Sequence, residues 1–261
     1  MEQELVTVQV EKYDQLHDCI TVQEVRWILR HCKRHSPYYT YFLLRATTGV
    51  RGSEILSWTL YHFSPDLKTI TYRVDKPFKN VNRNGELCVQ TKHRRVELDQ
   101  WVANELRVYL ETYGRVFNGE FVLSNPGQKL FSMRDNKIVI SYWYKLRRKM
   151  EKAGLDSFRL WRLYRRPNRD LGVFVLRPHI FRHFAASVMY YRLNKDIKAV
   201  QEWIKHEDSK TTSGYIHSAD SLGVPRELLE KASWAELLEF DEAQTTLRDA
   251  QIPSQTTLEG F

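Results

Sequence analysis

The stretch RPHIFRHFAASVMYY, residues 177–191, joins a group of basic side chains to an apolar helix pattern. His179, Arg182 and His183 lie within five residues at its start, and Phe184 begins the apolar part. Because residues three apart share a helix face, His179 and Arg182 are expected to point in one direction, away from the core that takes Phe184. This basic face lines a cleft or lies in water. A solvated helix end is the commoner fate of a single His/Arg pair, so the rest of the chain has to distinguish the two.

The segment ATTGVRGSEILSW, residues 46–58, contains a second basic group at a break between helices. Arg51 follows Gly49 in this break, and Glu54 comes about one helical turn later. An arginine at a helix entry can direct its planar guanidinium at a phosphate, and the helix dipole adds to the attraction. The alternative interpretation is a surface arginine paired with Glu54.

The segment VQEWIKHEDSKTTSGYIH, residues 200–217, ends a helix and continues through a polar turn. His206 lies just past the helix, and Gly214 directly precedes Tyr215. Glycine weakens helix formation at this position, which suits a tyrosine that has to move in and out of a site. The alternative is an ordinary tyrosine at the rim of a pocket.

Hydrophobic spacing and turn residues predict a mainly α protein with a small antiparallel β-sheet, the α+β class. Thr21 and Glu24 form a capping-box pattern at the start of the first helix. The other expected helices cover 38–60 in two pieces broken at Thr47–Gly49, 99–113, 136–154, 179–192, 195–205 and 225–240, and the expected strands cover 68–78 and 87–98. We divide the chain into a short extension (1–20), one domain (21–220) with an Arg-rich insertion at about 155–178, and a C-terminal helix with a polar tail (221–261).

The composition favours a globular protein with a polyanionic partner. The chain has 261 residues, of which 42% are hydrophobic and 28% charged, and its formal net charge is +8. This charge favours nucleic acid over a membrane surface as the partner. No apolar run approaches membrane-spanning length, and the first residues lack the order of a signal peptide. Three cysteines without metal-site spacing indicate reduced thiols, so we expect a cytoplasmic protein associated with the nucleoid.

Together, the three segments resemble the motifs of the tyrosine recombinase, or phage integrase, family. The matches are Thr48–Glu54 to T-G-x-R-x-S-E, His179–His183 to H-x-x-R-H, and His206 with Tyr215 nine residues later, with Thr211 and Thr212 between them, to the third motif. Three motifs in the family's order, each in its helical context, make a specific match. The resemblance covers roughly residues 20–220, which correspond to the family's catalytic domain.

The resemblance implies site-specific DNA recombination or integration through a covalent intermediate. The oxygen of Tyr215 attacks a DNA phosphodiester, which leaves a 3′-phosphotyrosine and a free 5′-hydroxyl, and a second hydroxyl then reseals the strand. Fixed cationic donors stabilise the five-coordinate phosphorus more than the ground state. Arg51 and Arg182 are expected to be these donors, with His206 as a further one. The phosphoester bond is exchanged and not hydrolysed, so no cofactor is expected.

Two proton transfers complete the implied reaction. The Tyr215 hydroxyl has to lose its proton as it attacks, and His179 is its expected base. In the family a lysine on a β-hairpin protonates the departing 5′-oxygen; Lys92 is the best match, while Lys76 and Lys79 lie in the same region. A solvated turn lysine is the alternative for Lys92. Two residues are expected to support the site: Glu54 beside an arginine, and His183 as a buried histidine bonded to the backbone.

A basic segment with interleaved aromatic residues predicts a surface that contacts the DNA backbone. Residues 145–169 are dense in lysine and arginine and also contain Phe158, Trp161 and Tyr164. The candidate DNA-binding residues are Arg94, Arg95, Arg147, Arg148, Arg159, Arg162, Arg165 and Arg166. A solvated basic helix is the alternative.

Three features depart from the family pattern. The extension 1–20 is too short for the N-terminal helical domain with which most members clamp DNA, so we expect weak DNA affinity. The link from Gly154 to His179 is longer than usual and is expected to form its own hairpin against the DNA. Lys205 stands where the family commonly has a glycine.

The quaternary structure is expected to depend on DNA. The chain would be a monomer or weak dimer when free and a homo-tetramer on double-stranded DNA. The apolar residues of 225–240 fit a helix that docks on a neighbouring protomer equally well as one that packs on its own core.

Two other functions are compatible with parts of the pattern. A type IB topoisomerase or telomere resolvase has a similar active site, and relaxation of supercoiled plasmid without a sequence requirement would favour the topoisomerase. A DNA-binding protein without catalysis would make the motif matches accidental.

Overall fold

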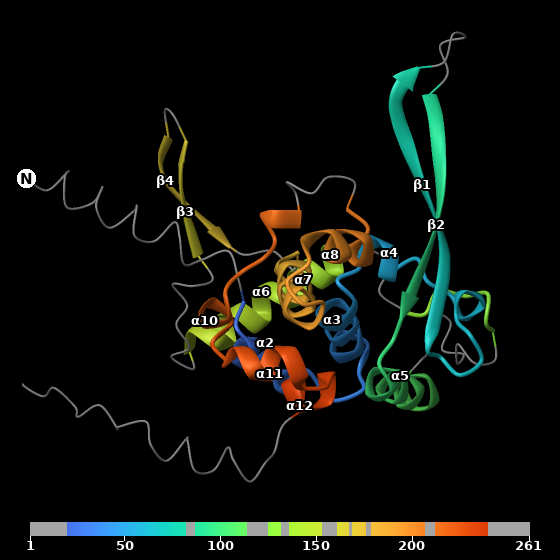
Figure 1. Ribbon diagram of the computed structural model, residues 1–261, viewed down its shortest axis with the longest axis horizontal. Coiled ribbons are helices and arrows are strands. Elements are labelled where there is room, and N and C mark those ends of the chain that lie inside the picture. Colours follow the sequence, from blue (N-terminus) through green and yellow to red (C-terminus); the bar gives the residue numbers. More distant parts are fainter. Residues whose placement is uncertain are drawn as a thin grey trace, which may run out of the picture.

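The computed structural model describes residues 20–81, 87–113, 125–131, 136–152, 161–166, 169–175, 179–206 and 212–239. They form a body of helices from which a long two-stranded β-hairpin extends (Figure 1). The mainly α fold with a small antiparallel sheet agrees with the class that the sequence predicts. None of the helices in these ranges is both long and apolar enough to cross a membrane.

The first helices contribute many of the buried residues of the core. Helix α2 (Val22–His31) begins at Thr21, whose capping box with Glu24 is present as predicted. Helix α3 (Pro37–Thr48) is buried along Tyr39–Thr48 and packs mainly against α7 and α5. It ends at Gly49, which has a left-handed backbone (φ 63°), and the short helix α4 (Gly52–Ile55) follows. The predicted break between the two helices is therefore confirmed.

The two predicted strands pair as an antiparallel hairpin. Strand β1 (Thr69–Val81) lies beside β2 (Leu87–Glu97), with Thr69 opposite Glu97 and Val74 opposite Lys92. A 3-10 turn, η1 (Leu60–His62), precedes them, and helix α5 (Gln100–Thr112) follows. Tyr72 is buried and its ring packs edge-on against Trp58, which joins the base of the hairpin to the core.

The middle of the chain contains a helix and a second hairpin. Helix α6 (Asn136–Lys152) packs Trp143 of its buried face against Phe42 and Phe181. Strands β3 (Trp161–Arg166) and β4 (Arg169–Val175) pair antiparallel, so the hairpin expected within the Arg-rich insertion is present. Whether it contacts DNA stays a prediction.

The last helices close the core. They are α7 (Ile180–Arg192), α8 (Ile197–Ile204), α10 (Ala219–Leu222), α11 (Arg226–Lys231) and α12 (Trp234–Leu238). The prediction of one helix over 225–240 is wrong, because the chain leaves helical geometry at Ala232 and Ser233 caps a new helix. Leu229 and Leu237 are buried and pack within this chain's own core. The tail from 240 to 261 and the extension up to residue 19 lie outside the described residues.

Candidate active site

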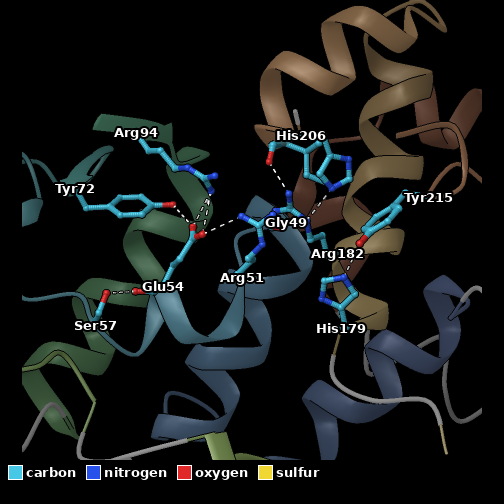
Figure 2. Close-up of polar contacts among 11 residues, drawn as sticks. Gly49, Arg51, Glu54, Ser57, Tyr72, Arg94, His179, Arg182, His206 and Tyr215 are labelled. Carbon is cyan, nitrogen blue, oxygen red and sulfur yellow. Dashed lines mark hydrogen bonds and ion pairs between the residues drawn. The ribbon is translucent and has the colours of Figure 1, made fainter. Parts of the chain in front are cut away.

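The three motif segments meet at one place in the fold. Figure 2 shows Arg51 at the start of α4, Arg182 and His179 at the start of α7, His206 after α8, and Tyr215 beyond it, with their polar ends turned toward one another. The guanidiniums of Arg51 and Arg182 are therefore neighbours. We call this group of converging basic side chains, with a phenol at its edge, the pocket.

Arg182 is fixed by backbone acceptors from two other segments. Its side chain is fully buried, at 1% exposed. Nη1 donates to the carbonyl oxygen of Gly49, and Nη2 donates to that of Ile204 at 2.7 Å. Nε donates to Nε2 of His206 at 3.3 Å. An arginine has five N–H groups, so these bonds leave one N–H on each terminal nitrogen.

Burial, followed by the positive charge of Arg51, lowers the pKa of Arg182 to about 10. The guanidinium still stays charged at neutral pH. A buried cation of this kind is costly unless it is paired, and it therefore favours an anion in the pocket.

Glu54 organises the other side of the pocket. Its carboxylate accepts from Arg51 at 3.2 Å, from Arg94 at 2.9 and 3.0 Å, and from the hydroxyl of Tyr72 at 2.7 Å. The Arg51 side chain remains 35% exposed, whereas that of Arg94 is 6% exposed. Glu54 thus holds Arg51 through its terminal Nη1, and the exposed part of the side chain is still open to an incoming ligand.

The position of Arg94 differs from that of a surface DNA contact. The sequence placed it among the DNA-binding arginines, but in the structure it is buried on β2 and paired with Glu54. The reason is the alternation of the strand, which turns Arg94 toward the core side and leaves the next residue, Arg95, exposed beside Glu97. Arg94 therefore supports the pocket through its contact with Glu54.

His179 contacts the hydroxyl of the candidate nucleophile. Its Nε2 lies 2.6 Å from the Tyr215 oxygen. Desolvation by the surrounding chain, and then the charges of Arg45, Arg182 and Arg51, lowers the pKa of His179 to about 4. Water still reaches part of this residue, but the direction of the shift is clear: the imidazole is neutral at pH 7 and can accept the phenolic proton.

Both nitrogens of His206 have partners within the protein. Nε2 accepts from Arg182, so in the neutral ring Nδ1 carries the proton and donates to Oγ1 of Thr212 at 3.1 Å. Burial and then the charge of Arg182 lower the pKa of His206 to about 4, so the ring is neutral at pH 7. The role of phosphate donor that the sequence predicts for His206 stays a prediction; in the structure its Nε2 contacts Arg182.

His183 lies flat against the phenol ring of Tyr215. The ring centroids are 3.8 Å apart and the planes differ by 11°. The sequence predicted a buried histidine bonded to the backbone, but its buried Nδ1 has no hydrogen-bond partner among the described residues. Its contact with the site is therefore the face of the ring.

Lys92 lies on β2, two residues before Arg94. Side chains two apart on a strand share a face, so Lys92 is on the same side of the hairpin as Arg94, and it is half-buried. The side chains of Lys76 and Lys79 lie outside the described residues, although both positions are part of β1.

The remaining candidate DNA contacts are distributed over α6 and the second hairpin. Arg148 is exposed on α6. Arg147 lies in the same helix, and Arg162, Arg165 and Arg166 lie in β3, but none of these four side chains is described. Arg159 lies outside the described residues.

Sequence reasoning missed Tyr72 and Ser187. Tyr72 donates to Glu54 from β1, a contact that no local pattern indicates. Ser187 bonds to the carbonyl of Tyr215. Its position four residues after His183 places it on the same helix face, and this spacing was the available signal.

Comparisons with known proteins concern the family and the fold of the chain. The family model described as "Phage integrase family" matches residues 18–221. Among solved structures, the chain is similar to XerA recombinase, with 19% identity, a TM-score of 0.51, and coverage of 80% of this chain and 61% of that one. This likeness shows the fold.

Two other solved structures are less similar. XerH site-specific recombinase, bound to palindromic difH substrate in a post-cleavage complex, has 19% identity and a TM-score of 0.46, over 80% of this chain and 52% of that one. The Tn1549 transposon integrase, in complex with a circular intermediate DNA, has 16% identity and a TM-score of 0.43, over 70% and 56%. The chain thus spans 61% or less of each of these three proteins. A comparison with curated proteins found no match.

Proposed function

This chain belongs to the phage integrase family, and we propose that it is a site-specific recombinase that breaks and rejoins DNA strands through a 3′-phosphotyrosine. The observation that carries the proposal is the 2.6 Å contact between Tyr215 and His179 at the edge of a pocket that contains two arginines. A phenol, a neutral base and fixed cations are the groups that this transesterification needs.

The first step forms one bond and breaks one. The Tyr215 oxygen attacks the phosphorus while its proton passes to Nε2 of His179. The bond from phosphorus to the 5′-oxygen breaks, and Lys92 supplies the proton that the leaving oxygen needs. Resealing is the same exchange in reverse, with a DNA hydroxyl as the nucleophile, so the energy of the phosphoester bond is retained.

The phosphate is held by guanidinium groups in our proposal. Arg51 offers its exposed end, and Arg182 offers the N–H groups that its protein acceptors leave. Because Arg182 is already fixed by Gly49 and Ile204, little reorganisation is needed when charge develops on the phosphoryl oxygens. Glu54 and His206 keep the two arginines in place.

The proposed partner is double-stranded DNA, met in the cytoplasm at the nucleoid. The net charge of +8 and the exposed Arg95 and Arg148 support backbone contacts. We further propose a homo-tetramer on DNA and a monomer or weak dimer when free. In the described part of the chain the apolar faces of α11 and α12 pack in cis, so another surface would join the protomers.

The test is covalent trapping. Nicked duplexes of randomised sequence are incubated with the protein, the nick lets the small leaving fragment diffuse away, and adducts are resolved on a denaturing gel. Tyr215→Phe should abolish the adduct, because no oxygen can attack. Tyr61→Phe is the matched control, since Tyr61 is 76% exposed on η1 and is no part of the pocket.

Two arginine variants test the phosphate pocket. Arg51→Ala should lower the rate of adduct formation by about 100-fold or more, by analogy with the loss of one preorganised donor. Arg182→Met should lower the rate of adduct formation by at least as much, when the rate is measured on the soluble, folded fraction of the variant. An adduct that persists in Tyr215→Phe overturns the proposal.

A further inference from the structure

Residues on one face of α7, and the residue that precedes the helix, contact Tyr215. His179, His183 and Ser187 follow each other at intervals of four residues, so they form a single stripe on the helix. His179 contacts the hydroxyl, His183 lies against the ring, and Ser187 bonds to the main-chain carbonyl. We call these three residues the α7 stripe.

Ser187 ties the tyrosine segment to the helix backbone. Its Oγ is 3.0 Å from the carbonyl oxygen of Tyr215 and 2.9 Å from that of His183, and it accepts the backbone N–H of His217 at 3.0 Å. Ser187 is fully buried. The hydroxyl has one proton, which the two carbonyls share, and it accepts the His217 N–H independently of that proton. Ser187 therefore holds residues 215–217 against α7.

The stack with His183 selects one orientation of the phenol. Tyr215 follows Gly214 in a turn, so regular secondary structure does little to limit its side chain. A parallel ring at 3.8 Å favours one rotamer over the others and fixes the tilt of the ring. The tilt decides where the nucleophilic oxygen lies relative to Arg182 on the same helix.

We propose that His183 and Ser187 are positioning residues for DNA cleavage, which hold the nucleophile at the height and tilt at which it reaches the phosphate. This inference rests on the proposed function, because it takes Tyr215 as the nucleophile. It assigns His183 the role of a flat surface and not that of a second base.

Two observations support the role of a flat surface. Nδ1 of His183 has no hydrogen-bond partner among the described residues, so the geometry leaves this nitrogen unused. Burial, followed by nearby histidines and Arg182, lowers the pKa of His183 to about 3. The ring is therefore neutral, and phenylalanine should replace it in function.

The experiment measures adduct formation at saturating nicked DNA in single-turnover reactions. The rate constant reports on positioning, while the amplitude reports on the fraction of folded protein. We expect His183→Ala and Ser187→Ala to lower the rate constant by about 10-fold or more, because a small misplacement of a nucleophile has effects of this order. His183→Phe should restore the rate constant to near the wild-type value, and DNA affinity should be unchanged in all three variants.

Matched controls remove similar contacts far from the pocket. His31 stacks on Trp27 in α2, and the Thr112 hydroxyl bonds to the carbonyl four residues earlier, as Ser187 does. His31→Ala and Thr112→Ala should keep the wild-type rate constant.

Three results would overturn the inference. They are wild-type rate constants in both alanine variants of the stripe, losses that appear only in amplitude, or a His183→Phe variant as slow as His183→Ala. If Tyr215→Phe still forms adduct, the proposed function fails instead, so the two failures are distinguishable.

Discussion

Arg182 donates a hydrogen bond to the carbonyl oxygen of Gly49, a residue 133 positions earlier in the chain. Gly49 can turn its carbonyl toward α7 because its backbone is left-handed. The bond joins the first and second motif segments directly, and the bond from Arg182 to Ile204 adds the third. The two terminal nitrogens of Arg182 are therefore held by main-chain acceptors, whose positions depend on the fold and little on side-chain identity.

Gly49→Ala should destabilise the protein and slow adduct formation. The new Cβ would be strained at φ 63° and would lie 3.3 Å from both Ala185 and Trp203. Gly223→Ala is the control: its φ is 71°, but its Cβ would meet only Thr21, at 3.6 Å. Urea unfolding should show a loss of about 1 kcal/mol for the control, from backbone strain alone, and a larger loss for Gly49→Ala. Equal losses and equal adduct rates would contradict the role of Gly49.

Glu54→Gln should lower the free energy of unfolding more than a substitution at an exposed position. The substitution leaves the buried Arg94 and the half-buried Arg51 without their carboxylate. Removal of one partner of a buried ion pair costs about 3 kcal/mol or more. Glu97→Gln, which breaks an exposed pair on the same strand, should cost under about 1 kcal/mol. Denaturant midpoints of the two variants provide the measurement, and similar values would show that the Glu54 network contributes little.

Lys205→Gly should stabilise the protein. Lys205 has a left-handed backbone (φ 59°) at the end of α8, which is the conformation for which the family commonly has glycine. Relief of this strain should raise the free energy of unfolding by roughly 0.5 kcal/mol, after allowance for glycine's greater freedom in the unfolded chain. Lys198→Gly, the same substitution inside α8, should instead lower it by roughly 0.5–1 kcal/mol. Changes of the same sign in both variants would contradict the assignment.

His183→Phe should make the protein less sensitive to acid. The pKa of His183 is lowered to about 3 in the fold, whereas an exposed histidine has a pKa near 6.5. Between these values the unfolded chain binds a proton that the folded chain does not, so stability falls as the pH drops below about 6.5.

Phenylalanine removes this contribution to the pH dependence. At pH 5 the free energy of unfolding of His183→Phe should exceed that of the wild type by at most about 2 kcal/mol. Residual access of water to the histidine ring reduces this difference. Melting curves at pH 7 and pH 5 provide the measurement. Parallel pH dependence of the two proteins would rule out His183 as a source of acid sensitivity.

The sequence predicted the parts of the fold that local chemistry determines. Thr21 and Glu24 mark the start of α2 because capping requires only a hydroxyl and a carboxylate three residues apart. The apolar residues of 225–240 continue at helical spacing, so the pattern does not indicate that one helix ends and that Ser233 caps another. Periodicity alone does not distinguish one helix from two that pack on the same core.

The sequence identified the groups that gather at the pocket but not what holds them. Arg51, Arg182, His179, His206 and Tyr215 come together as their motifs predict. The burial of Arg94 could not be predicted, because it depends on a carboxylate 40 positions earlier. The supporting contacts are long-range, and spacing along the chain contains little information about them.

The dependence of Arg182 on distant acceptors has a consequence for synthesis of the protein. Chains emerge from the ribosome N-terminal end first, so the guanidinium exists before Ile204, one of its carbonyl acceptors, has been translated. Only a polypeptide that continues past this point can lock the cation in place. A product that ends before Ile204 would therefore lack this acceptor, and its Arg182 would be held less firmly than in the full chain.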